Sequence, residues 1–200
     1  MTDIRQLQSE NLGEHFKGLD WSGREVSAIE FEDCVFSDCD FSEAQFKKCK
    51  FLDCRFVNCN LSVAKVTLSR FSNVEFESCK LIGVDWTTAA WPKYATPAQL
   101  KFIKCTLNDS SFFGLNLQEL VIEECKAHDV DFREGVFSDA NFGYTDFTNS
   151  MFRRTNLSGA NFAEATEYSI DIYINDIKRA KFTRFEAVRL LESLEIELVD

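Results

Sequence analysis

Large apolar residues recur at every fifth position along most of the chain. The series runs in one phase from Phe16 to Trp91 and resumes from Phe102 to Phe162, which gives 29 centres, of which only Ala127 is small. Seventeen of the 20 Phe and all three Trp occupy this phase, so the repeat governs the placement of aromatic residues. A period of five matches neither a helix nor a strand, which repeat at 3.6 and 2 residues. The pattern therefore predicts a larger coil in which each pentad makes one side and one corner.

A small residue precedes most centres by two positions, and Glu14 and Arg24 in the first coil depart from this pattern. All eight Cys share this position, and Ala, Ser and Thr occupy many of the others. Two residues of like orientation separated by one that points away are typical of a strand. We expect the large and small residues to point inward and to stack along the axis of the coil, filling the interior without cavities. The other three positions of each pentad are mostly polar and should face solvent.

These pentads resemble those of the pentapeptide-repeat family, whose pattern is A/C-(D/N)-(L/F)-x-x. Clear examples are Ala140-Asn141-Phe142 and Ala160-Asn161-Phe162, and the likeness extends from about Phe16 to Phe162. The resemblance implies an all-β fold, a right-handed quadrilateral β-helix with four pentads per coil. Twenty-nine centres then give about seven coils and, at ~4.8 Å per stacked strand, a rod of roughly 34 Å.

The pattern divides the chain into three parts. Residues 1–15 form an N-terminal extension, residues 16–165 form the β-helix with an interruption at 92–101, and residues 166–200 form a connector and a helix. Two prolines in the interruption indicate a bulge or short loop. It is either a tolerated insertion or a projection that contacts a partner through Lys93 and Tyr94.

The C-terminal part carries the signals of a short α-helix. Thr183 and Glu186 have the spacing of a capping box, and a helix should run from Arg184 to about Leu194. Ala187, Leu190, Leu191 and Leu194 make an apolar stripe at helical spacing. The stripe covers the open end of the last coil, forms a dimer interface, or does both.

The charge of the chain points to a protein partner. A net charge of −11 disfavours direct binding to nucleic acid or to an anionic membrane and is compatible with a basic protein, although it also describes an ordinary acidic surface. The position two after each centre is outward and biased toward acids. The candidate partner-binding residues there are Asp33, Asp38, Glu43, Asp53, Asp109, Glu119, Glu124, Asp129, Glu134 and Asp139.

The sequence offers no sign of catalysis. It lacks a Gly-rich phosphate loop and a nucleophile elbow, and the spacing and shared phase of the cysteines argue against a metal site. We therefore expect no cofactor and no enzymatic activity. Without a recognisable signal peptide or membrane span, the expected location is the cytoplasm, where the eight thiols stay reduced.

The C-terminal segment narrows the resemblance. Ile170-Asp171-Ile172 and Asn175-Asp176-Ile177, together with Trp86-Thr87 and Trp91-Pro92, are similar to the topoisomerase-poison resistance group of the family. That group contains the Qnr-type quinolone-resistance, microcin-immunity and albicidin-resistance proteins, and the likeness is strongest to the albicidin-resistance type. The resemblance implies a homodimer that imitates duplex DNA, binds DNA gyrase or topoisomerase IV, and protects it from poisons. The alternative is an acidic β-helical scaffold or effector that binds an unrelated protein.

Overall fold

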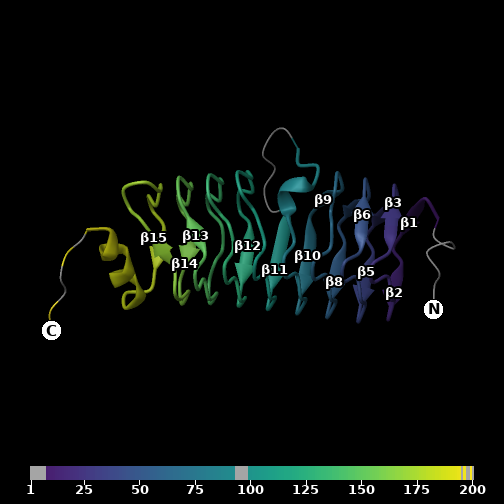
Figure 1. Cartoon of the computed structure of the whole chain (residues 1–200), viewed down its shortest axis with the longest axis horizontal. Coiled ribbons are helices and arrows are strands. Elements are labelled where there is room, and N and C mark those ends of the chain that lie inside the picture. Colours follow the sequence, from purple (N-terminus) through teal and green to yellow (C-terminus); the bar gives the residue numbers. More distant parts are fainter. Residues whose placement is uncertain (1–7, 93–98, 195, 197–198, 200) are drawn as a thin grey trace.

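The computed structural model describes residues 8–92, 99–194, 196 and 199. These residues form a right-handed, four-sided β-solenoid of about eight turns with a short helix at its C-terminal end. The stacked strands cross a rod whose two ends are β1 and this helix (Figure 1). The predicted fold class is confirmed. No helix in the described part of the chain is long and apolar enough to cross a membrane.

Most of the strands are three residues long, because each covers a single side of one coil. They are β1 (Glu10–Leu12), β2 (His15–Lys17), β3 (Glu25–Ser27), β4 (Glu30–Glu32), β5 (Val35–Ser37), β6 (Gln45–Lys47), β7 (Lys50–Leu52), β8 (Arg55–Val57), β9 (Arg70–Ser72), β10 (Val74–Glu77), β11 (Leu100–Ile103), β12 (Val121–Glu123), β13 (Met151–Phe152), β14 (Asn161–Phe162), β15 (Ser169–Ile170) and β16 (Lys181–Phe182). Two 3₁₀ helices, η2 (Trp86–Thr88) and η3 (Glu186–Leu194), complete the set.

Most coils advance by twenty residues, and all strand pairs between the described strands are parallel. Phe36 in β5 pairs with Phe16 in β2 and with Phe56 in β8, so equivalent centres stack directly on one another. Four pentads therefore make four sides. Side 1 carries Phe31, Phe51, Phe71, Leu117, Phe137 and Leu157; side 2 carries Phe16, Phe36, Phe56, Phe76, Phe102, Ile122, Phe142 and Phe162; side 3 carries Trp21, Phe41, Leu61, Leu81, Leu107, Ala127 and Phe147; side 4 carries Val26, Phe46, Val66, Trp86, Phe112, Phe132 and Phe152.

Aromatic ladders fill the interior. The rings of Phe36 and Phe56 are 4.6 Å apart and nearly parallel at 10°, whereas Phe36 and Phe41 on adjacent sides meet edge to face at 80°. Both geometries are favourable for aromatic pairs. Every centre named above is buried, and so are the eight Cys, as the repeat predicts.

The small residues satisfy backbone groups inside the rod. On side 3, the amide of Cys59 donates to Sγ of Cys79 at 3.3 Å, and the thiol of Cys79 donates to the carbonyl of Phe56 at 3.4 Å. Burial raises the pKa of the Cys54 thiol to about 12, so it stays protonated and unreactive near neutral pH. All eight thiols are free.

The corner between two sides is a residue in the left-handed region, two positions after each centre. Twenty-four described non-glycine residues have positive φ, and all but Glu167 hold this position. Most corners donate their N–H to a carbonyl on the next coil, usually nineteen residues later, as Asp33 does to Leu52 at 2.9 Å. Val63 (φ 59°) and Leu68 (φ 56°) are unusual corners, because β-branched and bulky side chains are strained there and both are more than half exposed.

The interruption is an insertion of six residues into one coil. Val74 pairs with Leu100 and Phe76 with Phe102, an offset of 26 instead of 20. The preceding stretch keeps the normal register up to Ala90, whose N–H donates to Ser69. Along the chain, the insertion follows η2. Lys93 and Tyr94 lie outside the described residues.

The coil extends beyond the apolar repeat at both ends. At the N-terminal end, β1 pairs with β4 inside the expected extension, and Asn11 takes a centre position, with its side-chain amide donating to the carbonyls of Gln8 and Glu30. At the other end, β15 and β16 pair with β13 and β14, so residues expected to form a connector continue the stack. This part was not recognised because Phe152 pairs with Ile170 at an offset of 18, which shifts the phase.

We expect overpacking of the interior to be costly. Cys54→Leu or Ala140→Leu places extra carbon atoms in a dry column and should destabilise the fold by about 1–3 kcal/mol. Ser27→Glu, on the exposed surface of β3, should change the free energy of unfolding by less than ~0.5 kcal/mol. Thermal denaturation measures both, and equal melting temperatures would contradict the inward assignment.

The strained corner at Val63 predicts a stabilising substitution. Val63→Asn replaces a β-branched residue with one that tolerates the left-handed region, and should stabilise the protein by about 1 kcal/mol. Asn149→Val, the reverse change at another corner between sides 3 and 4, should destabilise it by a similar amount. Thermal denaturation measures both changes. A melting temperature of Val63→Asn below that of the unmodified protein would show that the valine is not strained.

Candidate functional site

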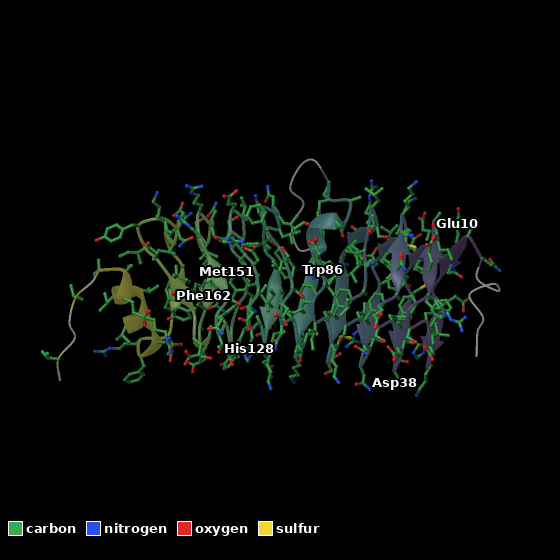
Figure 2. The ribbon with its side chains drawn as sticks, in the orientation of Figure 1. Glu10, Asp38, Trp86, His128, Met151 and Phe162 are labelled. Atoms are coloured by element: carbon green, nitrogen blue, oxygen red, sulfur yellow. The ribbon has the colours of Figure 1, made fainter. Side chains whose placement is uncertain are left out.

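The ten acidic residues selected from the sequence are all exposed corner residues. Their φ angles lie between 52° for Asp33 and 61° for Asp109, so each projects from an edge where the chain turns. Charged side chains extend from the rod along its whole length, Asp38 among them (Figure 2). The sequence therefore located these residues on the surface but did not show which of them share an edge.

The twenty-residue coil distributes them over four edges. Edge 1 joins sides 1 and 2, edge 2 joins sides 2 and 3, edge 3 joins sides 3 and 4, and edge 4 joins sides 4 and 1. Edge 1 carries Asp33, Asp53, Glu119 and Asp139; edge 2 carries Asp38 and Glu124; edge 3 carries Glu43, Asp109 and Asp129; edge 4 carries Glu134.

Ion pairs separate these edges into two classes. On edge 2, Asp38 lies 3.6 Å from Nζ of Lys17 and Glu124 lies 3.7 Å from Nζ of Lys104. On edge 4, Glu134 lies 3.6 Å from the guanidinium of Arg154. Within the described part of the chain, the carboxylates selected on edges 1 and 3 have no ion pair, and only Asp53 accepts a side-chain hydrogen bond, at 2.7 Å from Asn73. Uncompensated negative charge thus runs along two diagonally opposite edges.

Backbone conformation explains part of the acidic bias. Asp and Asn tolerate the left-handed region better than other non-glycine residues, so Asp33, Asp53 and Asp139 suit a corner whatever the partner. Glutamate has no such advantage. Glu43 on edge 3 and Glu119 on edge 1 therefore carry charge that the fold does not demand.

Several ion pairs lie on the flat sides of the N-terminal half. Lys47 and Lys50 lie 2.6 Å from Glu25 and Glu30 on the preceding coil, and Arg55 contacts Glu75 at 3.0 Å. These pairs join successive coils at exposed positions, where each contributes little to stability. In residues 8–92 and 99–194, no three His, Cys, Asp or Glu side chains gather to hold a metal ion.

The C-terminal helix differs from the expected one in period. It is a 3₁₀ helix, whose side chains repeat every three residues, so the expected stripe divides into two lines. Leu190 packs against the core and covers the end of the coil. Phe185 and Val188, which the sequence did not single out, are 86% and 50% exposed.

The period of three also places Leu191 and Leu194 in line with Phe185 and Val188. Ala187 shares the line of Leu190 instead. In place of the expected capping box, the hydroxyl of Thr183 accepts a hydrogen bond from the N–H of Glu164 and donates one to the Glu164 carboxylate at 3.0 Å. The Glu186 side chain accepts from Arg189, which also contacts Glu167 at 2.7 Å.

A parallel β-solenoid with five residues per side defines the structural class of this protein. The chain belongs to the pentapeptide-repeat family, because the pentapeptide repeat region matches residues 29–96 and 97–162. No curated protein matches the sequence significantly.

Two solved structures are similar to the chain over almost its whole length. Both are trypsin-treated variants of QnrB1, a plasmid-mediated fluoroquinolone resistance protein. One has a TM-score of 0.69 at 21% identity and covers 96% of this chain and 92% of its own. The other has a TM-score of 0.65 at 20% identity, with 93% and 100% covered. At 20–21% sequence identity, the similarity to these structures shows a shared fold and no more.

Proposed function

We propose that the protein binds DNA gyrase or topoisomerase IV in place of duplex DNA and protects the enzyme from poisons. The observation that carries this proposal is the pair of diagonally opposite edges with unpaired carboxylates along an unbranched rod. Duplex DNA likewise presents two lines of negative charge on a rod. The fold shared with a fluoroquinolone resistance protein, and the resemblance of the C-terminal segment to poison-resistance members of the family, support the same function.

The charge density of the rod limits how closely it can imitate duplex DNA by electrostatics alone. About eight coils at ~4.8 Å give a rod of ~38 Å, so a net charge of −11 amounts to one negative charge per ~3.5 Å. Duplex DNA carries one per ~1.7 Å. Charge density is therefore about half that of DNA, and the rod shape supplies part of the match.

We further propose that the protein binds its partner without catalysing a reaction and that it acts in the cytoplasm. Because the C-terminal segment resembles the albicidin-resistance type, albicidin is the first poison to test.

We also propose that two copies join through η3. Phe185, just before η3, and Val188 are exposed, and Leu191 and Leu194 in the same line are half-buried, so this line is apolar surface at the end of the rod. A twofold dimer would bury this line on both copies and give a double-length rod.

The edge assignment predicts which charges matter for gyrase. Neutralising the unpaired edges with Glu43→Gln, Asp109→Asn and Glu119→Gln should weaken competition with DNA by about tenfold or more, since each exposed charge contributes up to ~1 kcal/mol. The matched control is Asp38→Asn, Glu124→Gln and Glu134→Gln, which changes the net charge equally but removes only ion-paired carboxylates. The control should lose less than about threefold.

Fluorescence anisotropy of labelled DNA on gyrase measures this competition at constant salt, and supercoiling and DNA-cleavage assays with a poison report protection. Equal losses in both triple variants would show that only net charge matters. Gyrase binding that neither triple variant changes, or its absence in the unmodified protein, would favour the alternative of an acidic scaffold for an unrelated protein.

The dimer proposal predicts separable roles for the two lines of η3. Val188→Asp with Leu191→Asp should give monomers by light scattering while the melting temperature changes little. Leu190→Asp should lower the melting temperature instead, because it introduces a charge at the core. A stable dimer in the Val188 and Leu191 variant would place the interface elsewhere.

A further inference from the structure

A surface of opposite character lies on side 4 in the C-terminal half of the rod. Phe113, Arg133 and Arg153 hold the same outward position on three successive coils, twenty residues apart. The register is fixed by the bridges from Ser111 to Asp131 and from Asp131 to Met151, the residue labelled in Figure 2. Stacked strands lie ~4.8 Å apart, so the ring and the two guanidinium groups form one continuous row.

Arg133 is held in place before any ligand arrives. Its Nε and one terminal nitrogen donate to the two carboxylate oxygens of Asp131 at 2.9 and 2.7 Å, and its guanidinium carbon lies 5.7 Å from the centre of the Phe113 ring. Partial burial opposes ionisation of Asp131, but the hydrogen bonds from Arg133 outweigh it and lower the pKa of the carboxyl. Because Asp131 and the Phe113 ring contact the Arg133 guanidinium from two sides, Arg133 loses little further conformational entropy when a ligand binds.

The row borders a surface pocket of about 160 Å³, lined by Phe113, Arg133, Glu134, Arg153 and Arg154. Arg153 is exposed and makes no ion pair with any described residue, and Arg154 contacts Glu134 only at 3.6 Å. With Asp131 included, three guanidinium groups face two carboxylates. The pocket is therefore locally positive on a protein whose net charge is −11.

Apolar surface accompanies this charge. Phe113 is 42% exposed and Met151, beside Arg153 on side 4, is 40% exposed. Arginine, aromatic residues and methionine are the types enriched in protein interfaces. The combination differs from Lys47, Lys50 and Arg55 in the N-terminal half, each of which pairs with an acid on a neighbouring coil.

We propose that this pocket docks an acidic segment of a partner protein, one that carries an aromatic side chain beside a carboxylate. The free donors of Arg133 and the unpaired fork of Arg153 match a carboxylate, and the exposed ring of Phe113 matches an aromatic group. A single carboxylate of a protein segment fits better than nucleic acid, because three guanidinium groups against two carboxylates leave one positive charge, which matches one anion rather than a chain of phosphates. The site uses different residues from the unpaired edges and stands apart from the proposed imitation of DNA.

A labelled synthetic peptide that alternates glutamate with tryptophan is the probe, and anisotropy gives its affinity for the full-length protein. Arg153→Glu should weaken binding by about tenfold or more, because a charge-assisted contact becomes repulsive. The matched control, Arg70→Glu, alters an exposed arginine of β9 on side 1 and changes the net charge equally, so it should stay within about twofold. Phe113→Ala should weaken binding several-fold through loss of the ring.

Two further measurements test the location and class of ligand. The Nε–H signal of Arg133 should shift in NMR spectra when the peptide is added, and a single-stranded oligonucleotide should not displace the peptide. The proposal is overturned by equal losses in Arg153→Glu and Arg70→Glu, by no detectable binding of the peptide, or by an unmoved Arg133 signal. Displacement by the oligonucleotide would assign the pocket to nucleic acid instead.

Discussion

The left-handed corner is the constraint on which the rest of this structure depends. Turning the chain every fifth residue requires positive φ there, at a cost of roughly 1–2 kcal/mol for an ordinary side chain, and 23 described non-glycine residues adopt it at corners. The hydrogen bond that most corners donate to the next coil helps to offset that cost. Because the corners recur at a fixed spacing, four sides close into a coil of twenty residues, and equivalent residues stack along the rod.

This stacking divides the sequence between structure and function. The large centre and the small residue before it are buried in the interior, where aromatic rings and thiols pack away from solvent. The remaining positions face solvent and vary without disturbing the core. Function in such a solenoid therefore resides in the pattern of charge and apolar groups that its sides and edges present, rather than in a pocket built by loops.

That outer pattern is not uniform. Two opposite edges hold the selected carboxylates that have no ion pair, while the selected carboxylates on the other two edges, Asp38, Glu124 and Glu134, each lie beside a cation. Side 4 adds a positive and aromatic pocket in its C-terminal half, and η3 adds an apolar line at the end of the rod. Three surfaces of different chemistry thus lie on one solenoid, and we propose a separate partner for each of them.

The amino-acid sequence by itself determined the period of five, the buried phase of Phe and Cys and hence the fold, because each pentad repeats the same local requirement. It also placed Asp33 and Glu119 at the surface. Only the tertiary structure decided that they share edge 1 while Glu124 lies on edge 2, since that depends on four pentads closing a coil and on six extra residues in one of them. The structure also revealed that Asn11 and Ile170 continue the stack although they lie outside the apolar pattern. It brought Phe113 and Arg133 together across neighbouring coils, and it showed that the period of three in η3 divides the apolar stripe into two lines. The physical reason is that a five-residue repeat specifies which way each side chain points, whereas neighbours twenty residues apart arise only when the coil closes.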